Sequence, residues 1–113
     1  QIWRISVAPS EGANLIETLT ANGLPIAGHF WDWAGGLVWL AVEAGGDAHA
    51  ATIRRAVAAT GGHATLVRAK AAVRAVVPPF QPQPAALAAL SDRVKLAFDP
   101  DRLFNPGRMV EGV

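Results

Sequence analysis

Alternating apolar and polar positions predict four β-strands in the first two thirds of the chain. In the first of them Trp3, Ile5 and Val7 alternate with a second set that contains Arg4, which is typical of a half-buried strand with the first three side chains facing inward. The second and third predicted strands are joined around Ala34 and a glycine pair, a combination that favours a hairpin. The four segments are residues 2–7, 26–33, 37–42 and 63–68.

Helical spacing of apolar residues predicts two helices between these strands. The first begins with Ser10 as its N-cap and stops at Gly23, because glycine accepts the left-handed conformation that ends many helices. The second covers residues 45–60, with Ile53 and Val57 facing the core. A β-α-β-β-α-β order of this kind predicts an α+β fold of the ferredoxin-like type, in which two helices cover one face of an antiparallel sheet with strand order 4-1-3-2.

The pattern divides the chain into three regions. Residues 1–69 form the predicted ferredoxin-like domain. Residues 70–84 end in a stretch with four prolines in seven positions, which predicts an extended connector. Residues 85–113 contain a predicted helix over 85–98, followed by a tail. The apolar stripe of this helix consists of Leu87, Leu90, Val94 and Phe98, and we expect it to pack on a surface outside the ferredoxin-like domain.

Composition and charge argue against several functional classes. Hydrophobic residues make up 51% and charged residues 17% of the chain, which favours a folded domain over disorder. The net charge is +1 and no basic run occurs, so neither nucleic acid nor an acidic membrane surface is an expected partner. Without cysteine the chain has no disulfide, thiolate nucleophile or iron–sulfur ligand. No apolar stretch reaches the length of about 18 residues that a membrane-spanning helix needs.

The tail carries a recognisable signature. Residues 98–108 read FDPDRLFNPGR, and a helix with Lys95 near its end precedes them. This pattern resembles the C-terminal signature of the flavin oxidase family that includes vanillyl-alcohol oxidase and the D-lactate and glycolate dehydrogenases. The segments DWAGG at 32–36 and GGHAT at 61–65 are similar to the FAD-binding subunit of bacterial glycolate oxidase.

The resemblance implies an FAD-linked oxidation of a 2-hydroxy acid to the 2-keto acid. It implies an FAD-binding domain before Gln1, since no glycine-rich phosphate loop joins a strand to a helix in this chain. It also implies an iron–sulfur partner subunit and a cytoplasmic location, with attachment to the inner membrane only through that complex. We therefore expect the 113 residues alone to be inactive and to hold no FAD.

Five positions are candidate functional residues, and three of them lie on predicted strands. His63 follows a glycine pair at the start of a strand, and His63 and Arg68 are candidate catalytic residues. Arg4 and Arg68 lie on strands that are neighbours in the predicted order, so we expect them to share a face where a guanidinium can bind a substrate carboxylate.

In the tail, Asn105 and Gly107 are candidates for the flavin vicinity. The prolines around them predict a rigid turn, whose amide side chain either caps its own backbone or contacts a polar heterocycle. The three histidines lack the spacing of metal ligands, so no metal site is expected.

A second hypothesis is a free-standing ferredoxin-like binding or regulatory module. It predicts that the helix at 85–98 packs on its own domain or on a second copy. Trp31 and Trp33 point the same way in a strand, which predicts an exposed aromatic patch of the kind found at interfaces.

Overall fold

The computed structural model describes residues 1–108, which fall into two compact units. The N-terminal unit comprises Gln1–Gln81 and the C-terminal unit begins at Pro82. Residues 109–113, the end of the predicted third region, lie outside the described residues.

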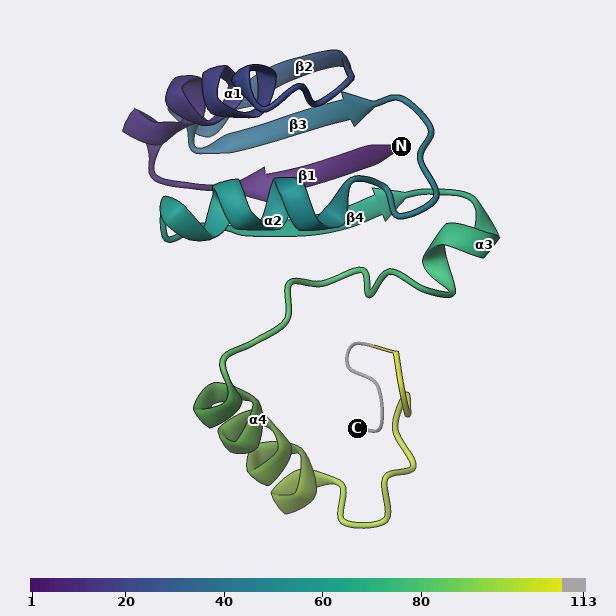
Figure 1. Cartoon of the computed structure of the whole chain (residues 1–113). Coiled ribbons are helices and arrows are strands. Elements are labelled where there is room, and N and C mark those ends of the chain that lie inside the picture. Colours follow the sequence, from purple (N-terminus) through teal and green to yellow (C-terminus); the bar gives the residue numbers. More distant parts are fainter. Residues whose placement is uncertain (109–113) are drawn as a thin grey trace. The chain divides into compact units, whose positions relative to one another are not determined.

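A four-stranded antiparallel sheet forms the centre of the N-terminal unit (Figure 1). Its strands lie in the order β2-β3-β1-β4, which is the predicted order read from the other edge. Each pairs with its neighbours in antiparallel register, from Ile2↔Ala41 between β1 and β3 to Ser6↔His63 between β1 and β4. The strands are β1 (Ile2–Ser6), β2 (Ile26–Asp32), β3 (Leu37–Val42) and β4 (His63–Arg68). The predicted ferredoxin-like α+β class is confirmed.

Two helices, α1 (Gly12–Ala21) and α2 (Ala50–Ala59), cover one face of this sheet (Figure 1). The inward residues of the strands alternate as predicted, and Trp3 and Ile5 are completely buried between sheet and helices. The eight largest fully buried side chains are Trp3, Ile5, Leu15, Leu19, Val38, Leu40, Ile53 and Val57. Both helices and the two central strands therefore contribute to one core.

Both helices begin later than the sequence indicates. Ser10 is no N-cap, because Pro9–Glu11 forms a short 3₁₀ helix before α1. The start of α2 moves to Ala50 because the preceding Ala48 and His49 adopt left-handed conformations, with φ of 52° and 55°. The turn formed by Ala48 and His49 is held against the sheet, since the indole N–H of Trp3 on β1 donates to the carbonyl oxygen of Ala48 at 3.0 Å.

The region expected to be a connector belongs largely to the N-terminal unit. A short helix, α3 (Ala71–Arg74), follows β4, and Val73 and Val77 are buried in the core cluster. Residues 78–81 then run along the free edge of β4, where the N–H of Leu66 donates to the carbonyl oxygen of Pro79 at 2.8 Å. The compact unit thus extends to residue 81 instead of 69, because apolar burial and edge hydrogen bonds hold the additional residues.

Arg54 of α2 ties residues 78–81 to the N-terminal unit from the helical side. Its guanidinium donates to the carbonyl oxygens of Pro78 and Phe80, the second at 3.0 Å, and lies 5.4 Å from the ring centroid of Trp3. Partial burial lowers the pKa of Arg54 from its ordinary value. The edge of β4 is therefore covered by the chain itself, which is one of the ways in which natural proteins protect exposed sheet edges.

In the C-terminal unit, α4 (Ala85–Phe98) forms as predicted and is followed by a turn at residues 99–108. No residue of α4 is buried. Among the described residues, no helix is long and apolar enough to span a membrane.

Candidate functional site

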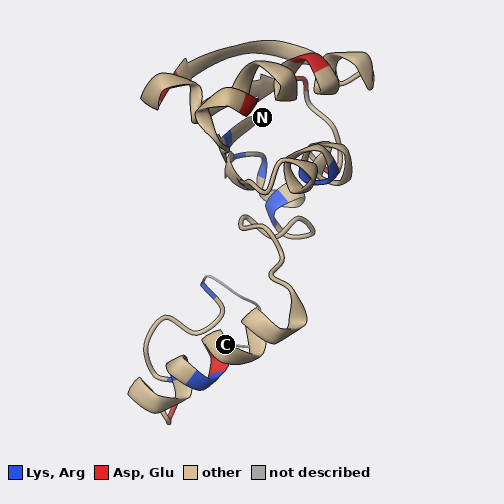
Figure 2. Cartoon of the chain, turned by 90° about the vertical axis from the view of Figure 1, so that its left-hand side faces the viewer, with Lys and Arg blue, Asp and Glu red and all other residues tan. Residues whose placement is uncertain are grey.

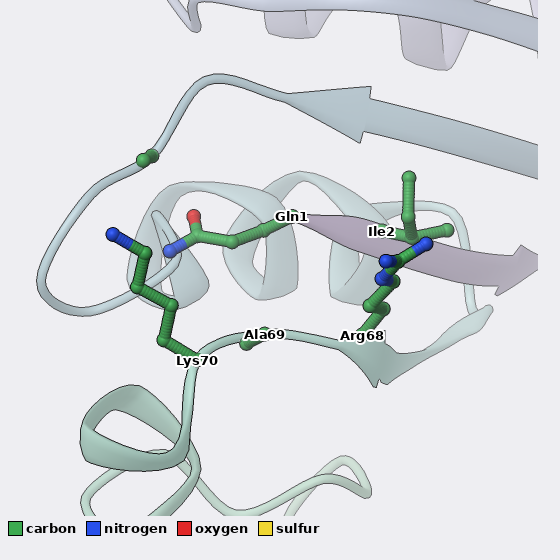
Figure 3. A pocket seen from close by; sticks show the side chains of 6 residues that line it. Gln1, Ile2, Arg68, Ala69 and Lys70 are labelled. Carbon is green, nitrogen blue, oxygen red and sulfur yellow. The ribbon is translucent and has the colours of Figure 1, made fainter.

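A β-bulge at the end of β4 positions Arg68. Trp3 pairs with Leu66, but the next pair is Ile2 with Arg68, so the register shifts by one residue there. The shift places Arg68 beside Ile2 on the outer face of the sheet, opposite the helices, as bulges commonly redirect a side chain. Figure 3 shows the Arg68 side chain rising towards Ile2.

Arg68 lines an open hollow of about 400 Å³ together with Lys70 (Figure 3). The hollow is lined by Gln1, Ile2, Ala44, Arg68, Ala69 and Lys70. Gln1 is fixed in place, since its side-chain amide donates to the carbonyl oxygen of Gly45 at 2.6 Å and accepts from the Gly45 N–H at 3.2 Å. The side chains of Arg68 and Lys70 stand on either side of Gln1 in this view. Among the described residues, the lining of this hollow contains two cationic side chains and no carboxylate.

Of the predicted cationic pair, only Arg68 lines the hollow. Arg4 alternates with the buried Trp3 and therefore lies on the same outer face as Ile2 and Arg68, as expected. It is not part of the hollow, where Lys70 takes its place. The sequence did not single out Lys70, because the turn after β4 that brings it back to Gln1 depends on the bulge and on α3.

The candidate catalytic pair is separated. His63 begins β4 and Arg68 ends it, so the two positions lie about 17 Å apart at roughly 3.4 Å per residue. His63 is exposed and pairs with Ser6 at the far end of β1. The structure therefore does not bring His63 and Arg68 into one site.

The tail is organised around the carboxylate of Asp99. This carboxylate accepts hydrogen bonds from the backbone N–H groups of Leu103 at 2.8 Å and Phe104 at 3.0 Å, and it forms an ion pair with Lys95. Lys95 also donates to the carbonyl oxygen of Phe104 at 2.7 Å. The signature lysine and aspartate are thus the groups that close the turn, and Asp99 is buried despite its charge.

Asn105 and Gly107 occupy two of the three left-handed positions of this turn, with φ of 49° and 67°, and Arg102 occupies the third with φ of 51°. Asparagine and glycine are the residues that tolerate this conformation best. The carbonyl oxygen of Asn105 accepts from the N–H of Arg108 at 3.2 Å. The Asn105 side-chain amide is exposed, and no hydrogen bond links it to another described residue. Of the two predicted roles, self-capping is therefore not observed among the described residues.

Acid should open the turn at Asp99. The hydrogen bond from Lys95 and the two backbone N–H groups lower the pKa of Asp99 from 3.8 to about 2. A lowered pKa means that the stabilisation is complete above pH 3.8 and is lost as the pH falls through about 2. We expect the amide resonances of Leu103 and Phe104 in the NMR spectrum to titrate with this midpoint. The Asp99→Asn variant should abolish that titration, and a midpoint close to 3.8 would contradict the prediction.

The apolar stripe of α4 is exposed. Leu87, Leu90 and Val94 are about half exposed, and Phe98 is 85% exposed. Leu103 and Phe104 of the turn are exposed as well. Within the C-terminal unit, neither the helix nor the turn covers these side chains, and large exposed apolar surfaces often mark interaction sites.

Trp31 and Trp33, the residues of the predicted aromatic patch, are 48% and 73% exposed in and after β2, the other edge strand. Phe30 alternates with Trp31 along β2 and stacks on Trp39 on the opposite face of the sheet, with ring centroids 6.1 Å apart. Trp33 is not in the strand, because β2 ends at Asp32 and a short 3₁₀ helix, η2 (Trp33–Gly35), forms the hairpin turn. His29 contacts Trp31 edge-on, with ring centroids 4.6 Å apart.

Comparison with protein-family profiles, with curated proteins and with solved structures finds no match to this chain. Among residues 1–108 there is also no group of three His, Cys, Asp or Glu side chains that could hold a metal ion.

Proposed function

We propose that this chain is the C-terminal part of an FAD-dependent 2-hydroxyacid oxidoreductase of the glycolate oxidase type. The observation that carries the proposal is the C-terminal unit. It presents an exposed apolar stripe, and its signature turn is closed internally by Lys95 and Asp99 while the Asn105 amide has no partner among the described residues. A preformed turn with a free amide is suited to contact a surface and a polar heterocycle.

The residues present fit FAD only in part. Asn105 offers one amide that can hydrogen-bond to a flavin, and Gly107 allows the turn its conformation. No loop among the described residues has the glycine-rich strand-to-helix form that binds phosphates, so the proposal assigns the rest of the cofactor to a preceding domain. When bound, FAD supplies the redox chemistry by accepting a hydride from the α-carbon of the 2-hydroxy acid. An iron–sulfur subunit is the proposed acceptor of the electrons.

The structure narrows the roles that this chain can take in such an enzyme. His63 and Arg68 lie at opposite ends of β4, so the two candidate catalytic residues do not form a joint site. The catalytic base is therefore assigned to the preceding domain, and the N-terminal unit takes the part of a cap. The alternative is a free-standing ferredoxin-like module, in which the apolar stripe of α4 packs on its own domain or on a second copy.

The protein translated from the complete reading frame provides the test. We expect it to purify with FAD, and its flavin absorbance should bleach when glycolate is added without oxygen. The 113-residue chain alone should do neither. A complete protein that contains no flavin would refute the proposal.

The Asn105→Ala variant of the complete protein tests the proposed flavin contact. Loss of one neutral hydrogen bond costs about 0.5–1.5 kcal/mol, so we expect FAD to bind roughly two- to tenfold more weakly. Asn14→Ala, at an exposed position of α1, is the matched control and should leave FAD affinity unchanged. Equal effects of the two substitutions would remove Asn105 from the cofactor site.

A further inference from the structure

The two edges of the sheet differ in how they are covered. At the edge of β4, Ala64 and Leu66 donate backbone hydrogen bonds to residues 78–81. At the opposite edge, which β2 forms (Figure 1), no described residue hydrogen-bonds to the outer side of the strand. Lysine and proline commonly protect such edges, but β2 has no Lys, Arg or Pro and its ribbon carries no blue in Figure 2. The edge of β2 is therefore open to pairing with another strand.

The hydrogen-bond pattern of the sheet shows which backbone groups of β2 are free. Val42 exchanges both of its backbone hydrogen bonds with the start of β1, at 2.8 and 2.9 Å. The alternate residues of β3, Trp39 among them, therefore direct their N–H and C=O groups to β2, where Trp39 lies opposite Phe30. His29 and Trp31, on either side of Phe30, consequently direct their N–H and C=O groups to the free edge.

This edge is remote from the first residue of the chain. In the strand order β3 separates β2 from β1, and two strand spacings amount to about 10 Å. Along the strands, Trp31 lies opposite Val38 and Val38 lies opposite Ile5, which is about 10 Å from Ile2. The exposed aromatic residues of β2 thus lie at the far corner of the sheet from Gln1.

The regular part of β2 is centred on Phe30. The register shifts between Ile26 and Gly28, and the strand ends at Asp32, so Gly28–Asp32 is the stretch in unbroken register. When two such stretches pair antiparallel with full overlap, Phe30 meets Phe30 of the second copy on the two-fold axis. Asp32 then faces Gly28 of the second copy, so the pairing opposes no like charges.

The side chains on both faces of β2 suit this pairing. On the outer face, the two Phe30 rings lie side by side and extend the stack that each makes with its own Trp39. On the helical face, His29 lies opposite Trp31 of the second copy, and an imidazole already contacts an indole in this way within each strand. The segment is therefore complementary to itself.

The exposed aromatic surface is large enough for a reversible dimer. Phe30, Trp31 and Trp33 are 59%, 48% and 73% exposed, which leaves about 350 Å² accessible in each copy if an aromatic side chain has roughly 200 Å². Two copies bring roughly 700 Å² from these rings, and the paired backbones raise the buried area towards the roughly 1,000 Å² of small specific interfaces.

We propose that the free edge of β2 is a self-association site, at which two copies of this chain pair antiparallel about Phe30. The two four-stranded sheets then form one continuous sheet, with the helices of both copies on the same face. This inference goes beyond the proposed function, because it concerns a protein interface and requires neither FAD nor redox chemistry.

A single cysteine at position 30 tests the pairing in the 113-residue chain, which has no cysteine of its own. The two residues on the axis form a non-hydrogen-bonded pair, with Cα atoms about 4.5 Å apart and thus within disulfide range. We expect Phe30→Cys to give a disulfide-linked dimer under mild oxidation, detected by non-reducing gel electrophoresis. Val67→Cys, at a similarly exposed apolar position of the covered strand β4, is the control and should stay largely monomeric. Equal yields would indicate random collision and overturn the proposal.

Charge substitution tests the same pairing without a covalent bond. By sedimentation velocity, Phe30→Lys and Phe30→Asp should each dimerise at least about tenfold more weakly than the wild type, because like charges meet on the axis. An equimolar mixture of the two should restore the dimer, since Lys then faces Asp. Val67→Lys should dimerise like the wild type. Far-UV circular dichroism shows whether each variant folds.

The exposed stripe of α4 provides the decisive comparison, because it is the other apolar surface at which two copies could meet. Leu90→Lys should leave the dimer within about twofold of the wild type. A dimer that is lost in Leu90→Lys and kept in Phe30→Lys would place association in the C-terminal unit and overturn the proposal. A wild-type chain that remains monomeric at the highest soluble concentration would overturn it as well.

Discussion

Replacing Trp3 with alanine is expected to lower the free energy of unfolding of the N-terminal unit by about 3–5 kcal/mol, the usual cost of a large-to-small substitution of a buried aromatic residue. Trp3 is completely buried on β1, one of the two central strands of the sheet. Its indole N–H holds the turn before α2 through Ala48, and its ring packs against the guanidinium of Arg54. The substitution therefore removes core volume and loosens both the start of α2 and the anchor of residues 78–81.

Urea denaturation followed by far-UV circular dichroism measures this effect without relying on tryptophan fluorescence. Trp33→Ala is the matched control, since Trp33 is 73% exposed in the hairpin turn and its loss should change stability by no more than about 0.5 kcal/mol. Trp3→Phe keeps most of the volume but not the hydrogen bond to Ala48, so its stability should lie between those of the wild type and Trp3→Ala. If Trp3→Ala and Trp33→Ala proved equally stable, the core described above would be wrong.

The strands could be predicted from sequence because their periodicity reflects burial on one face. Trp3 and Ile5 alternate with half-buried neighbours along β1, and this alternation survives unchanged in the structure. The strand order followed from the order of strands and helices along the chain. The alternation within each strand and the order of the elements both point to the same fold, and a fold is best predicted from sequence when its local patterns agree in this way.

The errors occurred where distant contacts override local preference. The start of α2 is delayed by a hydrogen bond from Trp3, which lies 45 residues away in sequence. The proline-rich segment has no regular pattern, yet Arg54 and the edge of β4 hold residues 78–81 to the N-terminal unit. Val73 and Val77 are spaced four residues apart, which suits one face of a helix and indicates burial. The sequence did not show where they pack, and in the structure both are buried in the core of the N-terminal unit.

In the candidate site, too, local patterns could be predicted from sequence and positions set by distant contacts could not. Arg68 could be proposed from sequence because neighbouring strands place it near β1. Lys70 could not, since a β-bulge and the turn into α3 decide where its side chain lies. His63 and Arg68 both lie on β4, but their separation along the strand excludes a joint role.

The segments DWAGG, GGHAT and the C-terminal tail all suggested a flavoprotein, but the fold of the N-terminal unit accounts only for the first two. The glycines of DWAGG and GGHAT have structural reasons within the N-terminal unit. Gly35 has φ of 93°, and a Cβ there would lie 2.9 Å from the carbonyl oxygen of Pro9, while a Cβ on Gly36 would come within 3.2 Å of the carbonyl oxygen of Val7. The glycines in these two segments are therefore explained by the fold and are no evidence of a flavin site. Among the described residues, the Asn105 amide has no hydrogen-bond partner and no residue of α4 is buried, which is why the functional proposal depends on them.

The glycine pair after α2 allows this distinction to be tested. A Cβ on Gly62 would lie 2.4 Å from the carbonyl oxygen of Ser6 and 2.6 Å from a methyl carbon of Val7, so β1 and β4 would have to move apart. We expect Gly62→Ala to destabilise the N-terminal unit by about 3 kcal/mol, at the upper end of overpacking effects. For a domain of this size the melting temperature should fall by on the order of 10–20 °C.

Gly61 and Gly46 complete the series, because neither is crowded and only Gly61 has a positive φ. Gly61 has φ of 71°, but a Cβ there would meet no atom within 4 Å, so alanine should cost only the left-handed backbone strain of about 1–2 kcal/mol. Gly46 has neither constraint, and alanine should be neutral within about 0.5 kcal/mol. Thermal melts of the three variants should therefore rank Gly62→Ala below Gly61→Ala and Gly61→Ala below Gly46→Ala. A Gly62→Ala variant as stable as Gly46→Ala would mean that β1 does not approach the start of β4 this closely, and the GGHAT segment would then need an explanation outside the fold.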